Sequence, residues 1–331
     1  MKLSVCPSTL QPDFSSYSPA AIKTVFDGRK VSHIIHEPKP SEDSNEAREI
    51  IRNVGRISLS GAQPKFSMVI EEGLLRYAKE NERGEFIMKP APIGYQLINR
   101  EFCPANEHLT MQIASQVYGI ETAKNALCFF DSDGSMAYIT KRFDTFSGGK
   151  YPQEDFAALL GYSKGANGSD FKYAKGSYEE CGEIIKKYVK AQLPDLRKFF
   201  RIVVYNFLTL NDDAHLKNFS LIEKDDEYRL APAYDLLNTS LQIWNPTIFA
   251  LEKGLFREGM KLTDTRWVRL DDFITFGKRL GLPERVIKRD LDMFLSPQPL
   301  ARTLIERSFL SDSLKEKYWD SYDYRRKMLT F

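Results

Sequence analysis

Short apolar runs separated by turn residues characterise the chain between residues 57 and 143. The runs at 66–70 and 74–78 flank the sequence Glu-Glu-Gly, and a third run follows at 85–89. A glycine-containing turn between two such runs is typical of a β-hairpin. A second hairpin is expected where ALCFF and MAYITKRF flank the turn sequence Asp-Ser-Asp-Gly. This part of the chain is therefore predicted to form a small β-sheet.

One helix is predicted within this β-rich region. It begins at about Pro104, because Leu109, Ile113 and Val117 follow one another at four-residue spacing, and Gly119 is its stop signal. Such spacing places all three side chains on one face of a helix.

The strongest helical pattern of the chain lies at 195–210. One wide apolar face is formed there by Leu196, Phe199, Phe200, Val203, Val204, Phe207 and Leu208. A further helical pattern precedes it at 178–192. Two short strands at 219–222 and 228–231 are predicted to form a hairpin after it, and most of the remaining sequence is helical in pattern.

These patterns divide the chain into three parts. Residues 1–56 are rich in Pro and Ser and then charged, which predicts an irregular N-terminal leader with a helix near 45–54. Residues 57–143 are predicted to form a small β-rich N-terminal lobe, and 144–331 a larger α-helical C-terminal lobe. The glycine-rich sequence FSGGK follows the hinge between them. The expected fold class is α+β, with the bilobal layout of a protein kinase.

Composition narrows the class of protein without identifying it. The 331 residues suit two packed lobes, and 47 Lys and Arg against 45 Asp and Glu give a net charge of +2. Bulk charge therefore does not favour a protein that wraps nucleic acid or lies on a membrane surface. The sequence contains no apolar run of signal-peptide or membrane-spanning length, so a cytoplasmic protein is expected. Four scattered cysteines and the isolated pair His33 and His36 predict neither a disulfide framework nor a zinc site.

The densest group of polar residues is N-D-D-A-H-L-K-N-F-S at 211–220, directly after the strongest helix. Asp213 precedes Asn218 by five positions, and Asp235 follows the predicted hairpin. A hairpin returns the chain to its starting end, so both loops are expected at one cleft. Kinases use this order, with an Asp that orients the substrate hydroxyl and an Asn and a second Asp that bind Mg²⁺. Amide and carboxylate oxygens suit Mg²⁺ and are poor ligands for zinc or copper.

Simpler interpretations of these residues stay open at this level. Asp and Asn are common turn residues, so the segment could be a polar turn between a helix and a hairpin. A turn, however, does not require His215 and Lys217 in this register. Asp213 is expected to accept or orient the hydroxyl proton of the substrate. His215 either orients Asp213, contacts the γ-phosphate or is a packed loop histidine.

Upstream residues offer weaker signals for phosphate binding. Lys89 ends a predicted strand, where it could contact the α- and β-phosphates or could be an ordinary solvated lysine. Glu107 lies in the first turn of the next helix, where it could pair with Lys89 or interact with the helix dipole. The segment Ser58-Leu-Ser-Gly-Ala-Gln-Pro-Lys65 supplies small residues and a lysine, but it matches no standard phosphate-binding motif.

Together these pieces resemble the HipA-like kinases, the toxin components of bacterial toxin–antitoxin systems. The resemblance spans roughly residues 55–240, and Lys141 stands where a carboxylate is common in the family. The motifs that carry it, in order, are S-L-S-G-A-Q-P-K (58–65), M-K-P (88–90), N-E (106–107), K-R-F-D (141–144), E-D-F (154–156), N-D-D-A-H-L-K-N-F-S (211–220) and P-A-Y-D-L-L (232–237).

The resemblance implies a site for ATP and Mg²⁺. It makes Asp213 the catalytic aspartate, with His215 beside it, and it places the autophosphorylated position of the family at Ser58, possibly with Ser60. Lys141, Arg142 and Phe143 would form the hinge beside adenine. The residues implied at the nucleotide are Ser60, Gly61, Ala62, Gln63, Pro64, Lys65, Lys89, Glu107, Lys141, Arg142, Phe143, His215, Leu216, Lys217, Asn218, Tyr234 and Asp235, with Asn218 and Asp235 on the metal.

The implied function is phosphorylation of a protein serine or threonine, for which the family suggests an aminoacyl-tRNA synthetase as target. The implied partners are a helix-turn-helix antitoxin and a small HipS-like protein, so DNA would be reached through the antitoxin and no membrane is involved. The chain is most similar to the short HipT-type kinases, because the extra β-domain of longer members would not fit into the first 55 residues.

Two other functions remain open. A small-molecule kinase of aminoglycoside or choline type shares the Asp-to-Asn spacing and the later Asp. It would carry a closed acidic or aromatic substrate pocket in the helical part. An ATP-binding regulator without catalysis is the second, and the intact Asp213, Asn218 and Asp235 argue against it.

Overall fold

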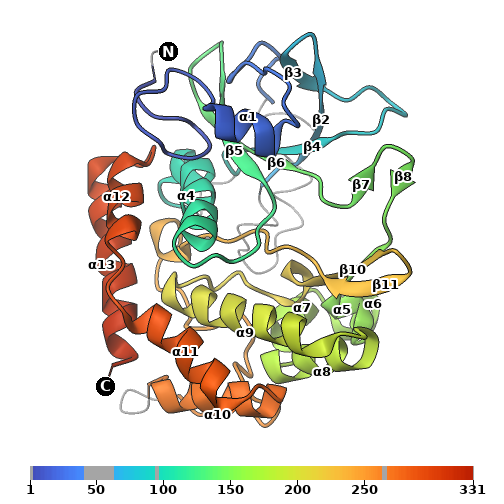
Figure 1. Ribbon diagram of the computed structural model, residues 1–331, viewed down its shortest axis with the longest axis vertical. Coiled ribbons are helices and arrows are strands. Elements are labelled where there is room, and N and C mark those ends of the chain that lie inside the picture. The colour runs from blue at the N-terminus through green and yellow to red at the C-terminus, as the bar shows by residue number, and fades with distance from the viewer. Residues whose placement is uncertain (1–2, 41–62, 94–96, 263–266, 331) are drawn as a thin grey trace.

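The computed structural model describes residues 3–40, 63–93, 97–262 and 267–330. A β-sheet occupies one half of the molecule and helices occupy the other, as Figure 1 shows. This mixture of a sheet with helices agrees with the sequence pattern. Among the described residues, no helix is both long enough and apolar enough to span a membrane. The helix predicted near 45–54 lies outside the described residues.

The sheet has six strands in the order β1-β5-β6-β4-β2-β3. Every neighbouring pair is antiparallel except β1 and β5. The predicted strands at 66–70, 74–78 and 85–89 and the hairpin around 131–134 are all present. The strands are β1 (Ile34–Ile35), β2 (Phe66–Glu71), β3 (Leu74–Tyr77), β4 (Phe86–Pro90), β5 (Asn125–Phe130) and β6 (Met136–Lys141).

Residues 3–40 are not an irregular leader, which corrects the expectation for this segment. They contain α1 (Pro19–Val25), and β1 extends the sheet by pairing with β5. The Tyr17 hydroxyl donates to the carbonyl of Leu127 at 2.8 Å. The short apolar pieces of the segment are buried against the sheet, at Cys6, Tyr17, Ala21, Val25, Phe26, Val31 and Ile35. Their burial stabilises a segment whose own sequence carries little periodicity.

Helix α4 (Cys103–Gln116) lies between the sheet and the helical half (Figure 1). It is buried on every side from Cys103 to Ala114, including the polar residues Asn106 and Glu107. The Asn106 amide donates to the carbonyl of Asn238 at 2.8 Å, which fixes the helix to the segment that follows the hairpin of β10 (Ser220–Lys224) and β11 (Glu227–Leu230). The helix thereby holds its first turn at the junction of the two halves.

The helical half is built around α9 (Gln192–Leu208), whose predicted apolar face is buried throughout. One hydrophobic cluster continues from α4 through α9 to the C-terminal helix, so the two halves share a core. The other α-helices of the described residues are α5 (Phe156–Leu159), α6 (Lys164–Asn167), α7 (Phe171–Ala174), α8 (Tyr178–Tyr188), α10 (Leu270–Leu280), α11 (Glu284–Leu295), α12 (Pro299–Arg307) and α13 (Asp312–Met328).

The glycine-rich segment after β6 is more regular than a linker. It forms a small hairpin of β7 (Thr145–Phe146) and β8 (Gly149–Lys150). The next strand, β9 (Gln153–Asp155), pairs with β10 (Ser220–Lys224), and β10 pairs with β11 (Glu227–Leu230) as predicted. The segment with β7 and β8 connects the six-stranded sheet to β9. Because β9 pairs with β10, this connection is held close to the loop at 211–218.

Candidate active site

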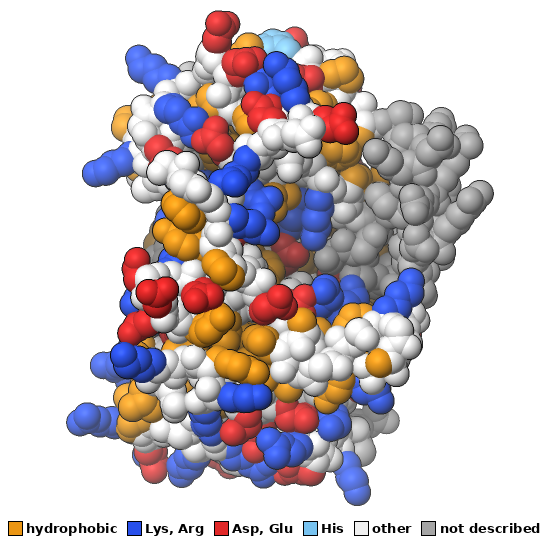
Figure 2. Space-filling model, turned by 90° about the vertical axis from the view of Figure 1, so that its right-hand side faces the viewer, with side chains coloured by type: hydrophobic (Ala, Val, Ile, Leu, Met, Phe, Trp, Pro, Cys, Tyr) orange, Lys and Arg blue, Asp and Glu red, His pale blue; other side chains and the backbone are white. Residues whose placement is uncertain are grey.

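A pocket of about 290 Å³ lies where the sheet meets the helical half. Basic side chains gather at this hollow of the surface in Figure 2. Its apolar wall includes Ile87 and Ala123, and its other walls carry charged and aromatic groups. The residues singled out from the sequence that line it are Lys65, Lys89, Lys141, Arg142, Phe143, Tyr234 and Asp235. An apolar and aromatic wall beside clustered cations suits a ligand with a flat ring and an anionic tail.

A chain of buried charges joins three separate segments beside this pocket. Lys89 Nζ of β4 lies 2.7 Å from Glu107 Oε1 of α4, and it also forms an ion pair with Asp235. The side chains of Lys89 and Glu107 are 5% and 3% exposed. Lys65 Nζ approaches the other oxygen of Asp235 at 3.7 Å. The ion pair between Lys89 and Glu107, one of two interpretations left open by the sequence, is therefore present.

Burial and neighbouring charges act in opposite directions on these three groups. Burial alone would lower the pKa of Lys89, but the carboxylates of Asp235 and Glu107 raise it above its ordinary value. Burial raises the pKa of Glu107 to about 7 in spite of Lys89. Burial would also raise the pKa of Asp235, yet Lys89 and Lys65 hold it well below its usual range. Asp235 is therefore a charged carboxylate at neutral pH.

The backbone of Asp235 is held in an unusual conformation. Its φ of +55° lies in the left-handed region, which residues other than glycine adopt infrequently. Two residues earlier, Ala233 forms backbone hydrogen bonds with Glu121 and Ala123 at 2.8 and 2.9 Å. The Asn211 amide donates to the carbonyl of Asp235 at 3.3 Å. Conformations of this kind persist where the surroundings fix them, and they are frequent at functional sites.

Asp213 lies buried at the bend after α9. The Tyr173 hydroxyl donates to its carboxylate. The backbone N–H of His215 and the side-chain amide of Asn218 both donate to the Asp213 carbonyl, at 2.8 and 2.7 Å. Position 218 therefore closes the loop upon position 213, which explains the five-residue spacing in structural terms. The carboxylate is fixed by an aromatic residue from α7.

The side chain of His215 does not hydrogen-bond to Asp213, although orienting Asp213 was one of its expected roles. Both ring nitrogens are buried and have no hydrogen-bond partner among the described residues. Burial lowers the pKa of His215 to about 4, although the carboxylates of Asp213 and Asp235 act to raise it. The imidazole is therefore neutral at pH 7. Its ring meets the Tyr173 ring edge-on, with centroids 4.9 Å apart.

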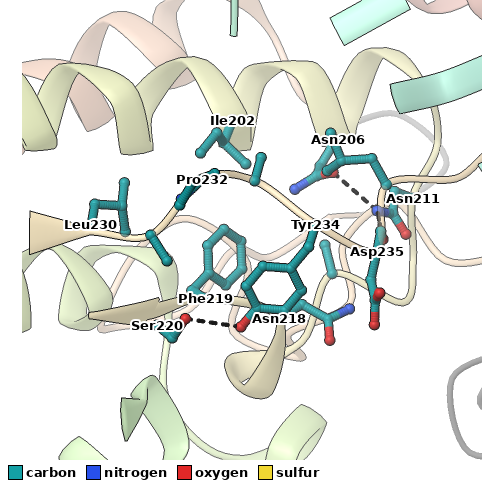
Figure 3. A pocket seen from close by; sticks show the side chains of 14 residues that line it. Ile202, Asn206, Asn211, Asn218, Phe219, Ser220, Leu230, Pro232, Tyr234 and Asp235 are labelled. Atoms are coloured by element: carbon teal, nitrogen blue, oxygen red, sulfur yellow. Dashed lines mark hydrogen bonds between the residues drawn. The ribbon is translucent and has the colours of Figure 1, made fainter. Parts of the chain in front are cut away.

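Asn218 and Asp235 fit a Mg²⁺ ion by the chemistry of their donors. Both line a small pocket behind the loop, and Figure 3 shows their polar groups at the same end of it. The Asn218 Nδ2 donates to the protein backbone, so Oδ1 is the ligand-type atom of that amide. A charged carboxylate and an amide oxygen are hard ligands of the kind that Mg²⁺ prefers.

The residues expected at the hinge take part in two kinds of contact. The ammonium of Lys141 pairs with Asp27 of the N-terminal segment at 2.5 Å, and Arg142 pairs with Asp144 at 2.7 Å. The Phe143 ring packs against the Tyr234 ring, with centroids 5.8 Å apart. This aromatic pair joins the residues that follow β6 to the segment that carries Asp235.

The remaining expected site residues differ in position. Ser58, Ser60, Gly61 and Ala62 lie outside the described residues. Gln63 is buried, and its amide donates to the carbonyl of Pro90 at 2.9 Å, which holds the residues before Lys65 near the end of β4. Pro64 lies between Gln63 and Lys65 in the sequence. Leu216 is buried in the core, whereas the ammonium of Lys217 pairs with Asp155 at 2.5 Å and its carbonyl accepts from Tyr234.

Sequence reasoning missed two residues of this site. Tyr173 reaches Asp213 across 40 positions in sequence, and it lies in a short helix without a clear pattern. Asn211 was quoted as part of a motif, but its contacts to Asn206 and Asp235 were not anticipated. The position of Asn211 inside the motif was the one available signal, whereas nothing near Tyr173 in the sequence marks its role.

Comparison with known proteins gives one family and several relatives. The family model of the HipA-like C-terminal domain matches residues 57–296. A Haemophilus influenzae protein named "Putative kinase" is 32% identical over 250 residues, covering 71% of this chain and 70% of that protein. A Sinorhizobium fredii protein named "Putative kinase Y4dM" is 32% identical over 214 residues, covering 60% of this chain and 49% of that protein.

A solved structure shares the fold. It is a chain from the Shewanella oneidensis MR-1 toxin–antitoxin complex of HipA, HipB and operator DNA. The TM-score is 0.62 at 19% identity, and the match covers 88% of this chain and 74% of that chain. At this level of identity, the likeness concerns the fold.

Proposed function

This chain belongs to the HipA-like family, and from that premise we propose that it is an ATP-dependent serine/threonine protein kinase. The observation that carries the proposal is the buried Lys89–Glu107–Asp235 chain of charges beside the 290 Å³ pocket. It joins β4, α4 and the segment after the hairpin at one point. The sheet and the helical half would then act as the two lobes of a kinase, with the nucleotide between them.

The pocket offers separate surfaces to the parts of ATP. The wall of Ile87, Ala123, Phe143 and Tyr234 suits the adenine ring, because aromatic and aliphatic groups exclude water from a flat base. Lys89 lines the same pocket and would bind the α- and β-phosphates. Glu107 fixes the ammonium in that position through its 2.7 Å contact. Lys65 adds a second cation that can approach the phosphates.

Asn218 and Asp235 would hold Mg²⁺ between the protein and the phosphates. A metal held by these two residues would supply positive charge to offset the negative charge that develops on the phosphates during transfer. Asp235 contributes a carboxylate that stays ionised, since the two lysines hold its pKa low. Its ion pair with Lys89 keeps the ligand oxygen in place before nucleotide enters.

Asp213 would position the acceptor hydroxyl and receive its proton. Tyr173 and the backbone bonds of the 213–218 loop fix the carboxylate, which reduces the reorganisation needed at the moment of transfer. His215 is neutral and lacks partners on both ring nitrogens among the described residues. It can therefore donate one hydrogen bond to a phosphate oxygen without carrying charge into the site.

The wider role that we propose follows the family. The kinase would be the toxin of a toxin–antitoxin system, with a protein such as an aminoacyl-tRNA synthetase as substrate. The related complex from Shewanella oneidensis contains HipB and operator DNA, which supports a DNA-binding antitoxin as partner. A small HipS-like protein would be a second partner. Self-phosphorylation at Ser58 or Ser60 would regulate the enzyme.

Transfer of the labelled γ-phosphate of ATP tests this function directly. Purified protein is incubated with Mg²⁺ and labelled ATP, alone and with a bacterial extract, and protein-bound label is measured. We expect Asp213→Gln to lose about a thousandfold in rate, which corresponds to roughly 4 kcal/mol of transition-state stabilisation. Asp212→Asn is the matched control, because that carboxylate accepts from the Thr247 N–H instead.

Two results would oppose the proposal. Equal labelling by wild type and Asp213→Gln would remove Asp213 from the mechanism. Label that accumulates in a small molecule of the extract, with none in protein, would favour the small-molecule kinase.

A further inference from the structure

Arg201 on α9 is a partly buried cation without an acidic partner among the described residues. Its Nη2 donates to the carbonyl of Tyr118, two residues after the end of α4. Its Nε is shielded from solvent and has no partner within the described part of the chain. Burial lowers the pKa of Arg201, and Arg197 and Arg289 act in the same direction. Shielded arginines are usually paired, because an uncompensated charge is costly to desolvate.

A pocket of about 260 Å³ lies beside this guanidinium. It is bounded by the residues that follow α4 (Gly119, Ile120 and Glu121), by α9 and by Ala231. Arg197, Lys198 and Arg201 all line it, so three cations from little more than one turn of α9 face a single space. It shares no lining residue with the pocket of the candidate active site.

The other cations of this pocket are already neutralised. Arg197 forms a two-point ion pair with Asp290, at 2.7 and 2.6 Å. Lys198 lies 2.9 Å from Glu121 and 3.5 Å from Asp195. Asp290 is close enough to raise the pKa of Arg201 but forms no ion pair with it. Among the described residues, Arg201 is therefore the cation of this pocket without an ion pair, and Lys198, whose side chain is 43% exposed, can turn toward a ligand.

We propose that the pocket lined by Arg197, Lys198 and Arg201 binds a small anion that carries a phosphate group. A planar guanidinium donates parallel hydrogen bonds to phosphate oxygens, and Arg201 lines this pocket. The volume accommodates a phosphate with a short organic substituent. Such a ligand would supply the negative charge that Arg201 lacks.

The position of this pocket gives the ligand access to the active-site backbone. Ala231 and Ile202 line both this pocket and the small pocket behind Asn218 and Asp235. Residues 231–235 lead from one to the other, and Ala233 in this segment hydrogen-bonds to the backbone of Glu121. A bound anion would thus lie against Ala231, which follows β11 directly and stands four residues before Asp235. The proposal itself does not depend on kinase activity.

Calorimetric titration with inorganic phosphate, at matched ionic strength in sodium chloride, tests the site. We expect Arg201→Gln to weaken phosphate binding at least tenfold and Lys198→Gln to weaken it several-fold. Lys65 lines the active-site pocket and Arg201 does not, so phosphate binding that Arg201→Gln weakens and Lys65→Gln retains belongs to the pocket beside α9. Lys190→Gln, whose side chain is 85% exposed, controls for surface charge.

Circular dichroism and thermal melting establish that each variant is folded. If Arg201→Gln fails to fold, the exposed Lys198→Gln carries the test. Glycerol 3-phosphate in place of phosphate distinguishes an ester ligand, which would bind more tightly, from the free ion. The proposal is overturned if wild type binds no phosphate, if folded Lys198→Gln and Arg201→Gln bind it like wild type, or if binding is lost in Lys65→Gln alone.

Discussion

Replacing Lys89 with methionine should reveal how strongly the buried charges hold the sheet to the helical half. The substitution keeps the length of the side chain but removes the ammonium that contacts both Glu107 and Asp235. The buried carboxylates of Glu107 and Asp235 then repel each other, and Lys65 is the remaining cation of this group. We expect a large loss of stability, because the three residues belong to β4, α4 and the segment after the hairpin.

The magnitude follows from distance and burial. At 2.7 Å the attraction of Lys89 and Glu107 amounts to about 6 kcal/mol with an effective dielectric constant near 20, before the cost of desolvation. Removing one partner of a buried pair typically costs about 3–5 kcal/mol, because the other charge is left uncompensated. We therefore expect Lys89→Met to lower the free energy of unfolding by about 3–5 kcal/mol at pH 8.

The loss should depend on pH in a defined direction. Burial already raises the pKa of Glu107 to about 7, and Lys89 is a cause that lowers it. Without Lys89 the pKa rises further, so at pH 6 the carboxyl binds a proton and the uncompensated charge disappears. A carboxyl with a raised pKa in the folded state contributes stability at low pH that is lost as the pH rises through that value. Lys89→Met should accordingly be less damaging at pH 6 than at pH 8.

Urea denaturation of wild type and four variants measures these quantities. Lys89→Met, Glu107→Gln and the double variant form a cycle whose coupling energy should be about 1–3 kcal/mol, because the residues are in contact. Lys141→Met is the matched control: its ion pair with Asp27 is 29% and 57% exposed and should contribute less than about 1 kcal/mol. A Lys89→Met protein within 1 kcal/mol of wild type at pH 8, or an additive double variant, would refute the reasoning.

Two further predictions concern acid stability and self-modification. Burial lowers the pKa values of His108 and His215 to about 4, so the unfolded chain binds more protons than the folded chain between pH 6.5 and 4. As the pH falls across that window, each histidine should therefore lower the free energy of unfolding by up to about 3 kcal/mol. The pH dependence of urea midpoints should be shallower in His108→Gln, and an unchanged slope would contradict the assignment. Mass spectrometry should find phosphate on Ser58 or Ser60 of wild type but not of Asp213→Gln, since a phosphoserine adds about −1.5 to −2 charges beside the proposed phosphate site. Unmodified serines in an active, ATP-treated wild type would oppose it.

Local patterns predicted most of the elements that position the site. The face of α9, the β2–β3 and β5–β6 hairpins and the β10–β11 hairpin lie where periodicity and turn residues indicated them. The spacing of Asp213 and Asn218 was informative because the Asn218 side chain bonds to the Asp213 backbone, a contact within five residues. Contacts of this kind can be predicted because both partners lie within one short stretch of sequence.

Other features depend on contacts between distant segments, and no local pattern records them. Tyr17 bonds to Leu127 across 110 positions, so the segment at 3–40 looks irregular by itself although it is packed on the sheet. For the same reason the sequence did not indicate Tyr173 of α7, whose hydroxyl donates to Asp213 across 40 positions. The left-handed backbone of Asp235 lies beside hydrogen bonds from distant segments, because Ala233 bonds to Glu121 and Ala123 and the Asn211 amide donates to the Asp235 carbonyl.

The affinity for a non-hydrolysable ATP analogue, measured by calorimetry with and without Mg²⁺, tests most directly whether these segments form one nucleotide site. Asp235→Ala removes a charged metal ligand, whereas His215→Ala removes one hydrogen bond worth about 1 kcal/mol, or roughly fivefold in affinity. With Mg²⁺ present, we predict a loss at least tenfold greater for Asp235→Ala than for His215→Ala, and a smaller difference when the metal is chelated. Equal losses in the two variants, or a difference unaffected by Mg²⁺, would contradict the assignment of Asp235 as the metal ligand of an ATP site.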